Sequence, residues 1–193
     1  KLQTLGIEEN TIVIFMSDNG TCGNAWKGRA NPYRADMRGE KGAEYDGGHR
    51  APFFIRWPAG NVPENQQTDL LAAYVDFMPT ILDLCGATVP AEKKFHGDSL
   101  VPLMHAGAGD FWKERIQVTD SQRVTTPEKW KQSAVMQDTW RLVNGVELYD
   151  IAGDRGQQHD IAAQHPDKVA ELRAGYEKWW ELVSTQFDEE VPV

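Results

Sequence analysis

The stretch Thr11-Ile-Val-Ile-Phe-Met-Ser-Asp-Asn-Gly20 decides how the first half of the chain is interpreted. Its apolar part, Ile12 to Met16, is unbroken and rich in β-branched residues, as in strands that are buried on both faces of a parallel sheet. Three polar residues and a glycine then end the run. In open α/β sheets, ligands bind in the crevice at the carboxyl ends of the strands. We therefore expect Asp18 and Asn19 to lie at such a crevice.

Two interpretations of this strand end are open. A carboxylate and an amide oxygen placed side by side are hard ligands that suit Ca²⁺ or Mg²⁺. Alternatively, Asn19-Gly20 is only a turn signal and Asp18 caps the next element. This stretch alone favours the turn, so the choice depends on the sequence that follows.

The composition indicates a folded chain, as one large or two small domains, with an excess of negative charge. The 193 residues are 40% hydrophobic and carry a net charge of −9, which disfavours non-specific binding to nucleic acid or to an anionic membrane. No apolar run approaches the ~18–20 residues of a membrane span, and no signal peptide opens the sequence. Residues 1–6 are typical of a last helical turn closed by a glycine. We expect from this start that the chain is cut from a longer protein, so missing signals do not define its compartment.

A second informative stretch is Gly39-Glu-Lys-Gly-Ala-Glu-Tyr-Asp-Gly-Gly-His-Arg-Ala-Pro52. Its tandem glycines, Gly47 and Gly48, indicate either a positive φ or a close approach of the backbone to another group. A lysine in such a loop, here Lys41, is usually solvated. The polar loop before it is either irregular and solvated or brings cations to an anionic substrate, for which arginine is well suited. Its aromatic and basic residues are Trp26, Lys27, Arg29, Arg34 and Arg38.

The ordered set of motifs closely resembles the C-terminal portion of type I sulfatases, in the alkaline-phosphatase superfamily. Besides the two stretches above, it includes Asp76-Phe-Met-Pro-Thr-Ile-Leu82, His96-Gly-Asp-Ser-Leu-Val-Pro-Leu103 and Leu148-Tyr-Asp-Ile151. The element Lys-Gly-x-x-Tyr-Asp-Gly-Gly-x-Arg-x-Pro is the specific part, whereas Ser-Asp-Asn-Gly alone is weak. The order of the two is what makes the resemblance strong.

The resemblance implies an α/β fold in two parts. Residues 1–106 are expected to form the C-terminal part of an alkaline-phosphatase-like catalytic sheet sandwiched by helices. Residues 107–193 are expected to form a small α+β subdomain, with an antiparallel sheet and a long C-terminal helix. The glycines around residue 107 mark the expected boundary.

The resemblance also implies hydrolysis of sulfate esters, either of aryl or of carbohydrate sulfates. Asp18 and Asn19 match the last two calcium ligands of the family, and Lys41 matches the lysine that contacts the sulfate and the bridging ester oxygen. The family's nucleophile is a formylglycine made from Cys or Ser, whose motif belongs to a missing N-terminal half. Neither Cys22 nor Cys85 fits that motif.

Candidate substrate contacts are the cationic residues expected near the entrance of the site. The implied partner is a sulfated small molecule or glycan, with no role for nucleic acid or membrane, and the family suggests a periplasmic or secreted protein. Two oxygen ligands cannot replace a calcium shell of roughly six or more, so we expect the 193-residue chain alone to be inactive. The candidate substrate-binding residues are Arg34, Arg38, His49 and Arg123.

Two alternatives remain open at the level of sequence. The first is a phosphodiesterase or phosphonate hydrolase of the same superfamily, although Asn19 in place of a histidine favours one hard cation over two zinc ions. The second is a non-catalytic module that binds acidic glycans through the arginines of residues 20–39.

Periodicity predicts most of the remaining elements. A second apolar strand is expected at residues 52–57, a buried strand at 70–75, and a helix at 77–85 that Asp76 caps and Gly86 ends. Cys85 is expected to be buried and His96 to lie at the surface. Four short segments near 116–119, 133–137, 140–143 and 147–151 predict an antiparallel sheet, with a hairpin at Asn144-Gly145. The apolar stripe of residues 166–187 predicts a helix that packs on this sheet.

Overall fold

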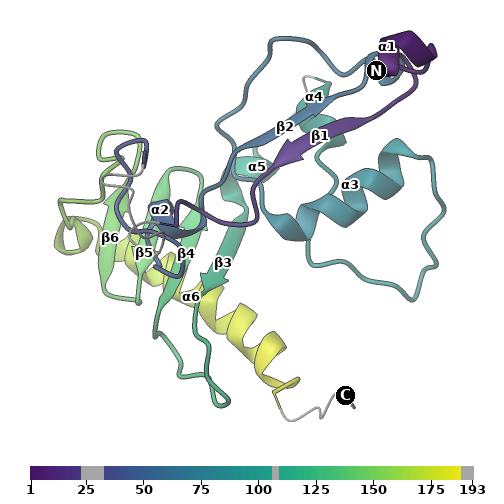
Figure 1. Ribbon diagram of the computed structural model, residues 1–193. Coiled ribbons are helices and arrows are strands. Elements are labelled where there is room, and N and C mark those ends of the chain that lie inside the picture. Colours follow the sequence, from purple (N-terminus) through teal and green to yellow (C-terminus); the bar gives the residue numbers. More distant parts are fainter. Residues whose placement is uncertain (23–32, 106–108, 188–193) are drawn as a thin grey trace. The chain divides into compact units, whose positions relative to one another are not determined.

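The computed structural model describes residues 1–22, 33–105 and 109–187 (Figure 1). The chain forms two compact units, residues 1–17 with 52–114 and residues 18–51 with 115–193. Residues 18–51, which hold the two informative motifs after the first strand, therefore pack with the C-terminal sheet. The domain bounds 1–106 and 107–193 remain a prediction.

The first unit contains short helices and a two-stranded ribbon. The strands β1 and β2 pair antiparallel, from Val13 opposite Arg56 to Met16 opposite Phe53. No helix in the described part of the chain is long and apolar enough to cross a membrane. The elements are α1 (Leu2–Leu5), β1 (Val13–Met16), β2 (Phe53–Arg56), η1 (Pro58–Gly60), η2 (Tyr74–Asp76), α3 (Phe77–Leu84), α4 (Val101–Met104) and α5 (Phe111–Glu114).

The expectation of a parallel strand buried on both faces is wrong for β1 within this chain. Its partner β2 is antiparallel, and the Phe15 and Phe54 side chains are 66% and 64% exposed. A two-stranded ribbon has too few neighbours to bury either face. The apolar run correctly identifies a strand, but periodicity carries no information about the direction of the neighbouring strand.

The expected buried strand at residues 70–75 is also wrong, because Tyr74–Asp76 forms the 3₁₀ turn η2. The fully buried carboxylate of Asp76 accepts hydrogen bonds from the backbone N–H groups of Ala73 (2.7 Å) and Asp98 (3.0 Å). It thereby ties the start of α3 to the segment before α4. Helix α3 is followed by Gly86 in the left-handed region, as predicted. Cys85, expected to be buried, is exposed at the end of this helix.

The second unit contains a four-stranded antiparallel sheet in the order β3-β4-β5-β6, which confirms the predicted strands. Asn144 and Gly145 have φ values of 49° and 70° and form the predicted hairpin between β5 and β6. This pattern of positive φ at both central positions favours Asn-Gly. The elements are α2 (Asp46–His49), β3 (Ile116–Asp120), β4 (Ser133–Gln137), β5 (Trp140–Val143), β6 (Glu147–Asp150), η3 (Ala162–Gln164) and α6 (Pro166–Ser184).

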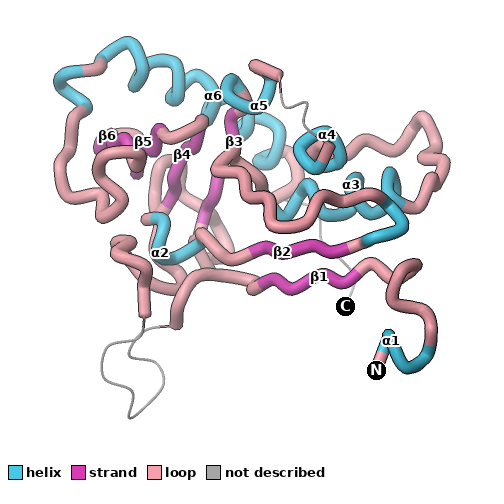
Figure 2. The backbone as a smooth tube through the Cα atoms, turned by 90° about the horizontal axis from the view of Figure 1, so that it is seen from above, coloured by secondary structure: helices cyan, strands magenta, loops and turns pink. Residues whose placement is uncertain are grey.

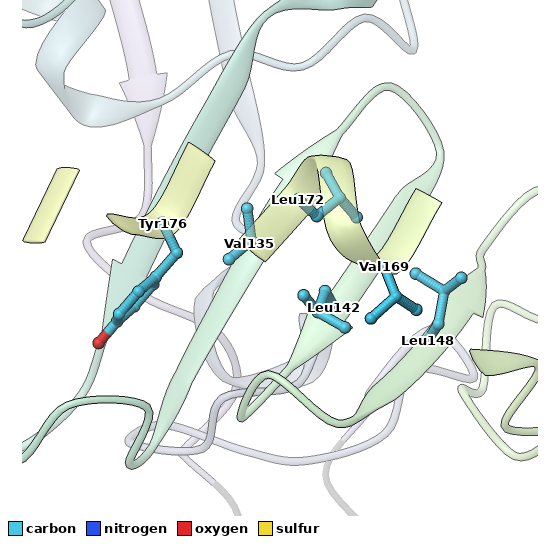
Figure 3. Close-up of a cluster of buried hydrophobic side chains, with 6 residues drawn as sticks. All are labelled: Val135, Leu142, Leu148, Val169, Leu172 and Tyr176. Carbon is cyan, nitrogen blue, oxygen red and sulfur yellow. The ribbon is translucent and has the colours of Figure 1, made fainter. Parts of the chain in front are cut away.

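Both faces of this sheet are covered, by α6 on one side and by the α2 segment on the other (Figure 2). The α6 face is apolar, as Figure 3 shows, and the aromatic stripe of α6 packs on it as predicted. On the opposite face, Tyr45 packs against Ala134, Val143 and Tyr149. All five residues of β4 are buried for this reason. The apolar cluster under α6 consists of Val135, Leu142, Leu148, Val169, Leu172 and Tyr176.

Candidate functional site

Two backbone hydrogen bonds join the polar turn after β1 to the loop that carries Lys41. The N–H of Gly20 donates to the carbonyl of Gly48 (3.0 Å), and the N–H of Lys41 donates to the carbonyl of Thr21 (2.9 Å). The two motifs, which are well separated in sequence, are therefore in direct backbone contact.

Glycine is required where these segments meet. A Cβ on Gly20 would lie 2.0 Å from the carbonyl oxygen of Gly47, and one on Gly48 would lie 2.1 Å from that of Ala43. Both distances are far inside any allowed contact, and the atoms in the way are backbone. Of the two interpretations of the tandem glycines, the structure shows a close approach of the backbone to other backbone atoms.

A buried ion pair anchors the Lys41 loop to the C-terminal sheet. Asp46, at the start of α2, is 1% exposed and accepts a hydrogen bond from Nε of Arg141 on β5 at 2.9 Å. A second cation, Arg50, lies 3.5 Å from the other carboxylate oxygen. Burial lowers the pKa of Arg141, and the negative charge of Asp46 opposes that shift. The backbone N–H of Asp46 donates to the side-chain oxygen of Gln157 at 2.9 Å, which adds a third tie.

An aromatic and hydrogen-bonded layer makes a second anchor beside this pair. The hydroxyl groups of Tyr45 and Tyr149 both donate to Glu147, at 2.9 and 2.6 Å. Burial raises the pKa of Tyr45 to about 12 and raises that of Tyr149 further, so both phenols are neutral donors. The guanidinium of Arg38 lies 3.8 Å from the centre of the Tyr45 ring and donates to the carbonyl of Gln157. Arg38, a predicted substrate contact, therefore makes contacts within the protein that hold this segment in place.

Lys41 is exposed and lines a hollow of about 460 Å³. Arg123, from the connection between β3 and β4, lines the same hollow, so two of the predicted functional cations are brought together. The carboxylate of Glu40 is also at this hollow and pairs with Arg34 at 3.0 Å. The remaining lining residues are Cys22, Gly42, Ser121, Val124 and Gln132.

The two predicted metal ligands, Asp18 and Asn19, directly precede Gly20 in the chain. Asp18 is exposed and Asn19 is half-buried, with the Asn19 amide N–H donating to the carbonyl of Gly20 at 2.9 Å. The donor types fit a hard cation, but their number falls short of a calcium shell. Among the described residues, no three His, Cys, Asp or Glu side chains gather as they would around a metal. A hollow shared by Asp18, Asn19 and the Lys41 ammonium remains a prediction.

The other two predicted contacts have different surroundings. His49 is mostly buried, and its Nε2 lies 4.0 Å from Asp46 without a hydrogen-bond partner among the described residues. Burial lowers the pKa of His49, so the imidazole is neutral near pH 7. Arg34 lines a separate hollow of about 360 Å³ together with Arg38. Trp26, Lys27 and Arg29 lie outside the described residues.

Comparison with known proteins confirms the resemblance to sulfatases. The Sulfatase family model matches residues 1–87. A curated N-acetylgalactosamine-6-O-sulfatase of Bacteroides thetaiotaomicron is 27% identical over 190 residues, covering 89% of this chain and 36% of that protein. The chain spans about a third of the length of the first curated relatives that it matches.

Solved structures confirm the fold class. The crystal structure of Ps i-CgsB matches with a TM-score of 0.76 and 25% identity, covering 92% of this chain and 38% of that one. The structure of BT4656 in complex with its substrate, D-glucosamine-2-N,6-O-disulfate, matches with a TM-score of 0.69. It covers 98% of this chain and 38% of that one, and its 20% identity shows the fold alone. The neighbours are sulfatases of the alkaline-phosphatase-like fold, and the chain corresponds to a part of them.

Proposed function

We propose that this chain is part of a sulfatase that hydrolyses aryl or carbohydrate sulfate esters, with Lys41 as a catalytic residue. The observation that carries the proposal is the direct backbone contact between two motifs of the sulfatase-like region, at Gly20–Gly48 and Thr21–Lys41. The printed functions of the relatives, which include an N-acetylgalactosamine-6-O-sulfatase, support a sulfated sugar as substrate.

Lys41 suits contact with a sulfate group because its ammonium is a compact point charge with rotatable donors. It is exposed at the mouth of a hollow, on a loop whose position is fixed by glycine packing and by the Asp46–Arg141 pair. A preorganised cation at the leaving oxygen stabilises the negative charge that develops there. Removal of one such group typically costs about 10²–10³-fold in turnover.

The proposal includes a calcium ion, for which Asp18 and Asn19 would each supply one oxygen ligand. A bound divalent cation would offset the charge of the sulfate group during transfer. The remaining ligands and the formylglycine nucleophile would come from an N-terminal half that is not in this chain. The 193-residue chain alone is therefore proposed to be inactive and to bind metal poorly.

The decisive test uses the complete gene product that contains this chain. We expect Lys41→Ala to lower kcat/KM for 4-nitrophenyl sulfate by about 10²–10³-fold, whereas Lys178→Ala changes it by less than about twofold. Lys178 is an exposed lysine of α6 in the same unit and serves as the matched control. Equal activity of the Lys41 variant and the wild type would overturn the assigned role.

Two further measurements separate the alternatives. Faster hydrolysis of bis(4-nitrophenyl) phosphate than of the sulfate ester would favour a phosphodiesterase. Retention of sulfated-glycan binding by Lys41→Ala, with no hydrolysis by the wild type, would favour a binding module. The 193-residue chain alone is expected to give no turnover of 4-nitrophenyl sulfate, and any rate above background contradicts its proposed inactivity.

The metal proposal has a readout that does not depend on activity. Calcium should raise the melting temperature of the complete protein after treatment with a chelator, because ligands that bind only the folded state stabilise it. Asp18→Ala should reduce that shift. An unchanged shift in the variant would exclude Asp18 as a ligand.

A further inference from the structure

We propose that Arg123 binds a second anionic group of the substrate, so that the site selects sulfated sugars carrying another sulfate or a carboxylate. This inference rests on the proposed sulfatase function and goes beyond it, because it names the substrate class and the residue that selects it. Lys41 and Arg123 line one hollow of about 460 Å³, although the two residues come from segments far apart in sequence.

The charge of the lining favours an anion. Within the described residues, neither Lys41 nor Arg123 forms an ion pair, so neither charge is neutralised by a neighbour there. The one carboxylate of the lining, on Glu40, pairs with Arg34 at 3.0 Å. Ser121 and Gln132 add neutral polar groups that suit the hydroxyls of a sugar ring.

The size of the hollow fits more than one charged group. A volume of about 460 Å³ is within the range of roughly 300–1,000 Å³ found for small-molecule sites. If Lys41 holds the sulfate ester that is cleaved, Arg123 faces another part of the same molecule. Arginine contacts a sulfate or carboxylate through two parallel N–H bonds, because its planar guanidinium matches the spacing of two oxygens on such a group.

The connection that carries Arg123 is ordered by the residue before it. The side-chain amide of Gln122 donates to Asp120 (2.9 Å) and to the carbonyl of Glu128 (2.8 Å), and its oxygen accepts from the N–H of Glu128 (2.9 Å). At the base of the connection, Ser121 N–H donates to the carbonyl of Gln132 at 3.0 Å. Gln122 is thus a positioning residue that holds the backbone on which Arg123 stands.

The test is competition against 4-nitrophenyl sulfate in the complete gene product, because a competitor need not be cleaved to be measured. The competitors are glucosamine 6-sulfate and glucosamine 2-N,6-O-disulfate. For the wild type, we expect the disulfate to inhibit at a lower concentration than the monosulfate. In Arg123→Ala, the inhibition constant of the disulfate should rise about 10–100-fold, since a charge-assisted pair is lost. The inhibition constant of the monosulfate should change by less than about threefold, because the monosulfate lacks the second anionic group.

Matched variants exclude a general loss of structure. Arg155→Ala removes an exposed arginine of the same unit and should leave both inhibition constants unchanged. Arg123→Lys should retain part of the selectivity, because it keeps the charge but loses the two-pronged contact. Gln122→Ala should weaken inhibition by the disulfate while Arg123 is still present.

Each outcome decides the question. If the wild type hydrolyses 4-nitrophenyl sulfate but binds the mono- and disulfate equally, the inference fails and the proposed function stands. If Arg123→Ala weakens both competitors equally, Arg123 is not selective for a second anion and the inference fails as well. If the wild type hydrolyses no sulfate ester, the proposed function fails, and the inference that rests on it fails with it.

Discussion

The two faces of the C-terminal sheet are covered by different chemistry. On one face, α6 buries aliphatic and aromatic side chains such as Leu142, Leu172 and Tyr176, each fully buried (Figure 3). On the other, the segment around α2 is held by directional contacts, chief among them the Asp46–Arg141 pair and the hydrogen bonds of Tyr45 and Tyr149 to Glu147.

The two faces differ in how precisely they can position the residues above them. Burial of apolar surface is non-directional, so the α6 face stabilises the unit without fixing any one side chain to a fraction of an ångström. Hydrogen bonds and buried ion pairs have narrow geometry. The second face therefore both stabilises the unit and positions the loop that presents Lys41. The predictions below test whether the two faces divide stability and positioning in this way.

The largest expected change in stability comes from the face covered by the α2 segment, called here the directional face because hydrogen bonds and an ion pair hold it. Asp46→Ala leaves the Arg141 guanidinium buried without its carboxylate, and loss of one partner of a buried pair typically costs about 3–5 kcal/mol. We expect the free energy of unfolding, from urea titration followed by hydrogen exchange of the β4 and β5 amides, to fall by that amount. Asp167→Ala, at the exposed first turn of α6, should cost less than about 1 kcal/mol. Similar losses in the two variants would contradict a buried anchor.

A substitution on the apolar face, under α6, should lower the free energy of unfolding without changing the position of the Lys41 loop. Leu172→Ala removes a fully buried side chain from the α6 cluster and should cost about 2–5 kcal/mol. Below its lowered melting temperature, the complete protein should keep the kcat/KM of the wild type for an aryl sulfate. Leu182→Ala, at a position 47% exposed, is the matched control and should change little. A loss of kcat/KM in Leu172→Ala at temperatures where it is folded would show that the faces are not separable.

The sequence predicted the apolar face well, and the reason is physical. The steps of three and four from Val169 to Val183 and the alternating strands are local patterns, and they specify which sides must be buried. Asn144-Gly145 specifies its turn because few other residues tolerate two consecutive positive φ values. The errors at β1 and at residues 70–75 have the same origin, because an apolar run shows a need for burial and not the partner that supplies it.

The directional face could not be predicted in the same way. Asp46 and Arg141 are 95 positions apart and Asp46 and Gln157 are 111 apart, and no local pattern links them. The family motif predicts roles for Lys41, Asp18 and Asn19, and these remain predictions, but it did not show that Arg38 and His49 make packing contacts. Gln122 and Glu40 carried no signal at all, since their importance lies in contacts made only after folding.

A glycine substitution in the Lys41 loop should have an effect on stability of intermediate size. Gly48→Ala forces a Cβ against the carbonyl oxygen of Ala43, and overpacking of this kind costs about 1–3 kcal/mol. The backbone must shift, so we expect loss of kcat/KM for an aryl sulfate beyond the loss of stability. Gly153→Ala places a Cβ in open space and is the control. Unchanged activity in Gly48→Ala, with a folded protein, would show that the Lys41 loop does not depend on this contact.

The smallest effect is a dependence of stability on pH that arises at His49. Burial lowers the pKa of His49 in the folded state, and the nearby Arg141 and Arg50 lower it further, while Asp46 acts in the opposite direction. The unfolded state, with a histidine pKa of about 6.5, binds more protons in mildly acid solution, so the free energy of unfolding rises with pH. The contribution is complete above about pH 6.5 and is lost as the pH falls toward the folded pKa.

His49→Gln removes this titration. Between about pH 7 and 5, the wild type should lose stability more steeply than the variant, by at most about 1.4 kcal/mol per pH unit for one proton. His159→Gln, at a side chain that is 82% exposed, should keep the slope of the wild type. Urea titrations of all three proteins across that range measure the slopes. Parallel curves for the wild type and His49→Gln would mean that the imidazole is not held neutral by the directional face.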